Sequence, residues 1–152
     1  MFKNNKIAGV DEVGRGCLAG PVFAAAVILD SKINTKGIKD SKKIPFKKRI
    51  ILSKYIKKNS TYAIGSASVN EISKINILNA SLLSMRRALK KLKRKPSIAY
   101  IDGSFAPKNI KIKYKTFIKG DEKIIPIAAA SIVAKVARDL FMIRLAKKYP
   151  KY

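Results

Sequence analysis

The sequence contains no histidine and only one cysteine, Cys17, and both shortages narrow the chemistry open to it. Without imidazole there is no histidine general base, no Ser–His–Asp triad and no histidine ligand for zinc. A single cysteine cannot form a disulfide within the chain, and we interpret Cys17 as a small apolar residue. Any enzymatic chemistry must therefore use carboxylates, lysines, hydroxyls or bound metal ions.

Long apolar runs are missing as well, because no stretch reaches the ~18 residues that a membrane-spanning helix needs. Residues 1–6 lead into a mixed, charged segment and lack the apolar core of a signal peptide, so we expect a cytoplasmic protein. The chain has 152 residues, of which 47% are hydrophobic and 28% charged. This length and composition predict a single globular domain.

Acidic residues are scarce: nine Asp and Glu oppose 34 Lys and Arg, which gives a formal net charge of +25. Such an excess favours a polyanionic partner such as nucleic acid, with binding that depends on salt. The bias towards lysine, alongside abundant isoleucine and asparagine, is also what a compositional drift towards lysine codons produces. Charge alone leaves both interpretations open.

Apolar runs bounded by turn residues predict the strands of the fold. These runs cover residues 7–11, 22–29, 62–67 and 98–102, and a further, half-exposed strand is expected where Ile110, Ile112 and Tyr114 alternate with lysines. The first three strands are expected to form an antiparallel meander.

Helices are predicted after Pro45, after a capping box formed by Ser68 and Glu71, and over residues 128–148. Apolar residues at helical spacing mark the core faces of the last two helices: Leu78, Leu82, Met85, Leu89 and Leu92 in one, and Ile132, Val136, Leu140 and Ile143 in the other. Together these elements predict an α/β fold, a mixed sheet flanked by helices.

Asp11 and Asp102 stand out among the acids, because each follows an apolar strand and precedes a glycine-containing turn. Carboxylates at strand ends point into the crevice where open α/β sheets place their ligands. Grouped there, they repel one another unless a divalent cation such as Mg²⁺ neutralises them. With Glu12 and a fourth acid they would hold two ions ~4 Å apart, an arrangement suited to phosphodiester cleavage.

Glu12 can join this group only under a geometric condition. Neighbouring strand residues face opposite sides of a sheet, so Asp11 and Glu12 both reach the site only if the pleat ends at Glu12. The glycines that follow favour such an ending. The alternative is an ordinary strand end that carries two solvated acids.

The glycine loop after this strand has two interpretations. Gly14, Gly16 and Ala19 fit the spacing of a dinucleotide-binding loop, but Asp11 and Glu12 would repel a pyrophosphate, and a strand follows in place of a helix. Without side chains in the way, the backbone amides of such a loop can approach a ligand closely, for example the 2′-hydroxyl of RNA. An ordinary tight turn explains the glycines equally well.

Several motifs, in order along nearly the whole chain, resemble the signature of the ribonuclease HII family. They are residues 9–16 (GVDEVGRG), 18–22 (LAGPV), 40–43 (DSKK), 76–81 (NILNAS), 101–103 (IDG), 119–121 (KGD) and 129–139 (AASIVAKVARD). The resemblance implies a ribonuclease H-like fold with a mixed five-stranded sheet flanked by helices. It also implies cleavage of the RNA strand of RNA–DNA hybrids, and of ribonucleotides embedded in DNA, with Mg²⁺ or Mn²⁺.

The resemblance assigns site residues by matching motifs. The catalytic and metal-binding carboxylates it implies are Asp11, Glu12, Asp102 and Asp121, and so it selects Asp121 over Glu122 or Asp139 as the fourth acid. The 2′-hydroxyl at the RNA-to-DNA junction is assigned to Gly14, Arg15 and Gly16. Phosphate contacts are assigned to Ser41, Lys42, Lys43, Ser131 and Lys135. For Lys135, an ion pair with Asp139 one helical turn on is the alternative.

The first functional hypothesis is a monomeric endonuclease that leaves a 5′-phosphate and a 3′-hydroxyl. Residues 1–152 are expected to form its single catalytic domain, without the family's C-terminal segment, whose Lys-Gly-Tyr motif stacks a tyrosine at the junction. Tyr152 does not match that tyrosine. The second hypothesis is a catalytically impaired remnant of the same fold that only binds nucleic acid. A pyridine-nucleotide enzyme is a distant third.

Overall fold

A computed structural model of the chain describes residues 6–15, 20–39 and 41–149. Its strands form one sheet in the order β3-β2-β1-β4-β5. They are β1 (Ile7–Val13), β2 (Val22–Leu29), β3 (Ser60–Ala67), β4 (Ile98–Asp102) and β5 (Lys113–Phe117). β1, β2 and β3 pair antiparallel, whereas β4 runs parallel to both β1 and β5. The predicted meander and the mixed five-stranded sheet are confirmed.

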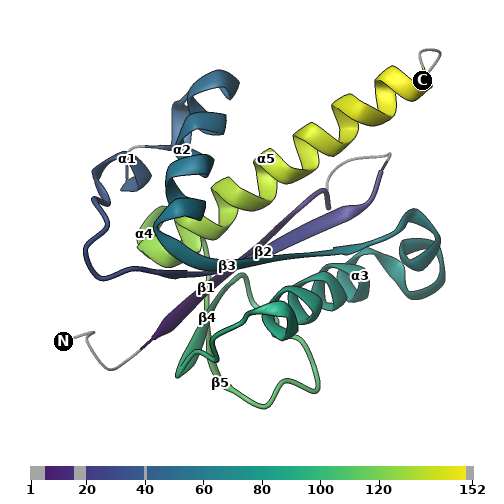
Figure 1. Cartoon of the computed structure of the whole chain (residues 1–152). Helices are drawn as coiled ribbons and strands as arrows, with labels where there is room; N and C mark the ends of the chain where they lie inside the picture. Colours follow the sequence, from purple (N-terminus) through teal and green to yellow (C-terminus); the bar gives the residue numbers. More distant parts are fainter. Residues whose placement is uncertain (1–5, 16–19, 40, 150–152) are drawn as a thin grey trace.

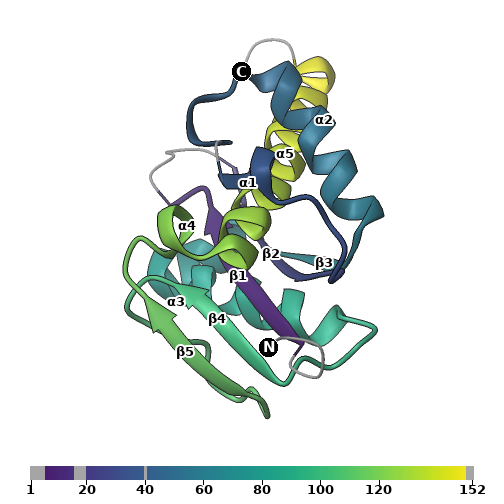
Figure 2. The ribbon, with the colours of Figure 1, turned by 90° about the vertical axis from the view of Figure 1, so that its left-hand side faces the viewer.

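Helices cover both faces of this sheet. They are α1 (Lys36–Lys39), α2 (Phe46–Lys58), α3 (Val69–Lys91), α4 (Gly120–Lys123) and α5 (Ile125–Lys148), with a 3-10 turn at Ser41–Lys43. α5 and α2 lie on one face and α3 on the other (Figure 1). β4 and β5 lie side by side, with β5 at the edge (Figure 2). Within the described ranges, no helix is both long and apolar enough to cross a bilayer.

An apolar cluster fills each side of the sheet. On the α3 side, Ala8 and Val10 of β1 pack with Met85 and Leu89. On the α5 side, Val27 of β2 belongs to a cluster rich in the alanines of α5. These small residues let the helix approach the sheet closely, and a Cβ at Gly9 would lie 2.0 Å from the carbonyl carbon of Pro126.

The capping box predicted for α3 is confirmed. The Ser68 hydroxyl accepts a hydrogen bond from the Glu71 N–H at 3.1 Å, and the Glu71 carboxylate accepts one from the Ser68 N–H at 3.0 Å. Arg87 donates to both Glu71 oxygens and to the Ser66 carbonyl, which ties the first half of α3 to its second half and to β3. α3 is kinked at Asn76, where φ is 71°, a feature that was not predicted from the sequence.

Two expectations about the edges of the fold are wrong in detail. The last strand begins at Lys113, and Ile110 and Ile112 lie in the loop before it, where they pack against the α3-side cluster. In α5, Leu140 and Ile143 are 39% and 41% exposed, because the C-terminal end of this helix extends past the sheet (Figure 1).

Candidate active site

Asp11 lies on the α5 side of β1. Because strand side chains alternate, it shares a face with Gly9, which contacts α5, and with Val13, which packs in the α5-side cluster. Only 5% of its surface is exposed. Its Oδ1 accepts a hydrogen bond from the Glu12 N–H at 2.8 Å, which orients the carboxylate.

Asp102 and Asp121 reach the same face from two other elements. The parallel register of Val10 with Ile101 brings Asp102, the next residue of β4, beside Asp11. After β5, Lys119 takes a left-handed conformation with φ of 54° and starts α4. This turn brings the Asp121 N–H to 3.3 Å from Oδ1 of Asp102, to which it donates. Three aspartates distant in sequence therefore meet on the α5 side.

The electrostatic state of Asp11 reflects this grouping. Burial raises the pKa of its carboxyl group well above the ordinary value, and the negative charge of Asp102 raises it further. Glu12 and Asp121 add smaller contributions in the same direction, against the opposing hydrogen bond from the Glu12 N–H. The charged form of Asp11 thus lacks a compensating cation among the described side chains.

Glu12 does not meet the geometric condition stated for it. The expectation that the pleat ends at Glu12 is wrong, since β1 continues to Val13 and pairs there with β2. Glu12 consequently shares a face with Val10, on the α3 side. Its pKa is raised to about 7, mainly by burial; Arg15 lowers it and Asp102 raises it. The charge of Glu12 therefore interacts with both Asp11 and Asp102, although its side chain starts from the opposite face of β1.

A divalent cation fits this group by the chemistry of its donors. The carboxylates offer hard oxygen ligands, and a cation would offset the repulsion and burial that raise the pKa of Asp11. As the side chains lie, no three acids among the described residues are arranged to hold an ion together.

The glycine loop begins against α5. Gly14 has a φ of +110°, and a Cβ there would lie 2.7 Å from Nε of Arg138. Arg138 is buried, 7% exposed, and its Nε donates to the Pro21 carbonyl at 2.9 Å. Arg15 is exposed, and Gly16 lies outside the described residues. Only Gly, without a Cβ, fits this approach of the loop to Arg138.

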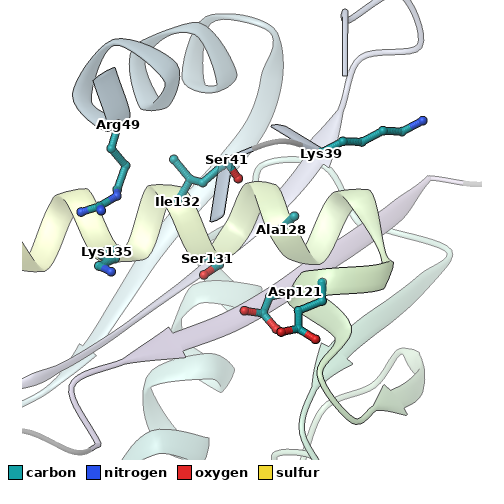
Figure 3. Close-up of a pocket in the computed structure, with 9 residues that line it drawn as sticks. Lys39, Ser41, Arg49, Asp121, Ala128, Ser131, Ile132 and Lys135 are labelled. Atoms are coloured by element: carbon teal, nitrogen blue, oxygen red, sulfur yellow. The ribbon is translucent and has the colours of Figure 1, made fainter. Parts of the chain in front are cut away.

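A pocket of about 330 Å³ lies on the α5 side, and Asp121 lines it together with Ser41, Ser131 and Lys135 (Figure 3). The Ser41 hydroxyl donates to the Ile38 carbonyl at 2.7 Å, so its proton is already engaged.

Two other predicted phosphate contacts lie in the 3-10 turn beside this pocket. Lys43 is exposed there, whereas the side chain of Lys42 lies outside what the structure describes. Asp139 is the alternative partner predicted for Lys135. In the structure Asp139 forms an ion pair with Arg49 of α2, with 3.5 Å between Arg49 Nη1 and Asp139 Oδ2. Sequence reasoning missed Arg49, since its place beside α5 depends on how α2 packs.

Solved structures share this architecture. A ribonuclease H2 from Pyrococcus horikoshii superposes with a TM-score of 0.80 at 30% identity, covering 95% of this chain and 77% of that one. Bst-RNase HIII in complex with Mn²⁺ gives a TM-score of 0.82 at 22% identity, over 97% of this chain and 56% of that one. The fold is therefore of the ribonuclease H class.

The sequence comparison specifies the family within this class. The family model described as Ribonuclease HII matches residues 8–152, and a ribonuclease HII from Pelagibacter ubique is 60% identical over 148 residues, which are 96% of this chain and 78% of that protein. The chain belongs to the ribonuclease HII family. Membership supports a ribonuclease H activity, that of a nuclease and hydrolase.

Proposed function

We propose that the protein is an endonuclease that hydrolyses the RNA strand of RNA–DNA hybrids, and ribonucleotides embedded in duplex DNA, leaving a 5′-phosphate and a 3′-hydroxyl. The observation that carries this proposal is the buried carboxylate of Asp11, grouped with Asp102 and Asp121 on one face of the sheet. An uncompensated negative group at strand ends is costly for folding alone, and is typical of a functional site.

The carboxylates that would hold Mg²⁺ or Mn²⁺ are Asp11, Asp102 and Asp121 on the α5 side, together with Glu12. Glu12 lies beyond the end of β4 in the β1–β4 register, so its side chain would reach the ions from the other side of β1. Such ions, when bound, lower the pKa of water and stabilise the negative charge that develops on a phosphodiester. The backbone orients two of these ligands, because the Glu12 N–H holds Asp11 and the Asp121 N–H holds Asp102. Burial between β1 and α5 keeps bulk water away from Asp11.

Substrate is bound on both sides of these carboxylates. Gly14, Arg15 and Gly16 contact the 2′-hydroxyl at the RNA-to-DNA junction. The close approach of Gly14 to Arg138 supports this assignment, because it positions the start of the loop against α5. Backbone phosphates are bound by Ser41, Lys42, Lys43, Ser131 and Lys135. Because its hydroxyl proton is engaged, Ser41 contacts a phosphate through its N–H or after rotation. We further propose that the protein acts as a monomer and that residues 1–152 belong to one catalytic domain.

Cleavage of labelled substrates tests this proposal. The wild type is incubated with an RNA–DNA hybrid, and separately with duplex DNA containing one ribonucleotide, in Mg²⁺ or Mn²⁺. Asp11→Asn is expected to lose at least about a hundredfold in rate, as when a group that stabilises the transition state is removed. The matched control is Asp30→Asn, an exposed aspartate after β2, which is expected to cleave like the wild type.

Each result has a distinct meaning. Product with a 5′-phosphate and a 3′-hydroxyl, lost in Asp11→Asn and kept in Asp30→Asn, supports the assignment. Equal cleavage by Asp11→Asn and the wild type contradicts it. Tight binding of the hybrid by the wild type, with no product in either metal, would instead favour a binding protein of the same fold.

A further inference from the structure

The pocket beside Asp121 has ends of opposite charge. Asp121 lies at one end, and Arg49 and Lys135 lie at the other (Figure 3). Ser41 and Ser131 line the stretch between them, and Glu122 also contributes to the lining. A basic end of this kind attracts the backbone phosphates of a nucleic acid.

Arg49 is fixed within this pocket by two contacts. Its Nη2 donates to the Ile44 carbonyl at 3.2 Å, and its Nη1 lies 3.5 Å from Oδ2 of Asp139 on α5. Its side chain is 17% exposed. A guanidinium group carries five N–H donors in a planar fork, so these contacts leave donors for a further acceptor. Arg49 therefore presents a partly desolvated, oriented cation to the pocket.

The neighbouring lysines are placed differently. Lys39 extends away from the other lining residues (Figure 3), and Lys135 is exposed on α5. An arginine whose fork is already oriented loses less side-chain freedom on binding than a lysine, and it matches two phosphate oxygens at once. Among the cations of this pocket, Arg49 is thus the best suited to a phosphate.

We propose that Arg49 is a phosphate contact for the bound duplex and that Asp139 is its positioning residue. This inference rests on the proposed function, and it adds two residues that the family motifs did not assign to substrate. Asp139 holds the guanidinium at the basic end of the pocket, and a backbone phosphate of the duplex takes up the donors that remain. The alternative is that the ion pair between Arg49 and Asp139 only stabilises the packing of α2 against α5.

Salt-dependent binding separates these two roles. A fluorescently labelled RNA–DNA hybrid is titrated with protein in EDTA, where no cleavage occurs, between 50 and 300 mM KCl. Removal of one phosphate-binding cation makes the slope of log K against log salt shallower by about 0.9. The variants are Arg49→Met and Asp139→Asn, which break the same ion pair but differ in whether the cation remains. Lys54→Met, an exposed lysine on the same helix, is the control for charge.

For Arg49→Met we expect Kd to rise about tenfold and the slope to become shallower by about one unit. Asp139→Asn keeps the cation, so its slope should equal that of the wild type while Kd rises less than about threefold. Lys54→Met should match the wild type in both quantities. If Arg49→Met does not fold, Arg49→Lys replaces it, with the slope kept and Kd raised because the fork is absent.

The inference would be overturned if Arg49→Met and Asp139→Asn both kept the wild-type salt slope and lost the same amount of melting temperature. The ion pair would then only stabilise the packing of α2 against α5. Failure of the wild type to bind the hybrid at all would overturn the proposed function itself, and the inference with it. The two failures are therefore distinguishable in one set of titrations.

Discussion

Asp11 combines burial with the repulsion of neighbouring acids, and both destabilise its charged form. Side chains of this kind that serve folding alone are normally paired with a cation or neutral. Its position is consistent with the proposed role, because a bound cation would compensate for the charge. The metal-free protein therefore carries an energetic cost at this residue.

Asp11→Asn should remove that cost. Asparagine keeps the shape and an oxygen that can accept the Glu12 N–H, but it carries no charge. In EDTA at pH 7.5 we expect the free energy of unfolding to rise by about 1–3 kcal/mol. Urea denaturation measures it, and Asp30→Asn should stay within about 0.5 kcal/mol of the wild type. A less stable Asp11→Asn variant would contradict the electrostatic account of this site.

Glu12 makes stability depend on pH. Its pKa is about 7 in the folded chain against an ordinary 4.5, so the folded state keeps a proton that the unfolded chain releases earlier. The stability that this group contributes is full below pH 4.5 and is lost as the pH rises through about 7. Glutamine does not titrate. In EDTA, the free energy of unfolding of Glu12→Gln should therefore rise relative to that of the wild type between pH 5 and pH 8. If the stability difference between Glu12→Gln and the wild type stays constant or shrinks between pH 5 and pH 8, the raised pKa of Glu12 is refuted.

The sequence indicated some of these residues and not others, for physical reasons. Asp11 and Asp102 were predictable because their strands are strongly apolar and end at glycine turns. Asp121 required the family motif, since nothing local shows that α4 folds back onto β4. The contact between Arg49 and Asp139 joins two helices far apart in sequence, and no local pattern encodes their packing.

At the scale of elements, close contact between α5 and the sheet positions the site. Gly9 permits it, because the first turn of α5 occupies the space where a side chain would be. The alanines of α5 and Ala25 of β2 continue the contact along the sheet. Displacement of α5 would also move Ser131 and Lys135, which line the pocket from the same helix.

Gly9→Ala tests this contact. The added Cβ would lie 2.0 Å from backbone atoms of Pro126, which cannot rotate away. We expect a loss of about 2–4 kcal/mol in the free energy of unfolding, measured by urea denaturation. In Gly37→Ala the nearest atom is a flexible Leu52 methyl at 3.6 Å, so the change should be below about 1 kcal/mol. Equal effects in the two variants would show that α5 does not need this close approach.

Elements with strong local signals were predicted well, and those that depend on tertiary contacts were not. The capping box and the apolar strands have a local cause, and both are confirmed. The kink at Asn76 has a local stabilising contact, since its side chain accepts from the Asn79 N–H at 2.9 Å and caps the second half of α3. Its left-handed backbone, however, is not evident from periodicity. The apolar residues before β5 alternate like a strand but pack as a loop.

For the molecule as a whole, the charge of +25 is the dominant property. A surface that evolved to bind nucleic acid releases condensed counterions on binding, whereas a compositional excess of lysine need not be concentrated at the duplex. The two origins of the charge therefore differ in the salt dependence of binding.

The affinity of the wild type for an RNA–DNA hybrid should fall at least about a hundredfold between 50 and 200 mM salt, as for proteins with several phosphate contacts. Fluorescence anisotropy in EDTA measures this fall without cleavage. A fall of less than about threefold would indicate few phosphate contacts and favour the compositional origin.

The central claim is that aspartates from β1, β4 and α4 meet on one face of the sheet to bind divalent cations. Isothermal titration of Mn²⁺ into the metal-free protein tests it most directly. We expect saturable heat for the wild type and for Asp30→Asn, and its loss in Asp11→Asn, with unfolding curves showing that both variants are folded. A flat titration of the wild type, or equal binding by Asp11→Asn, would contradict the claim.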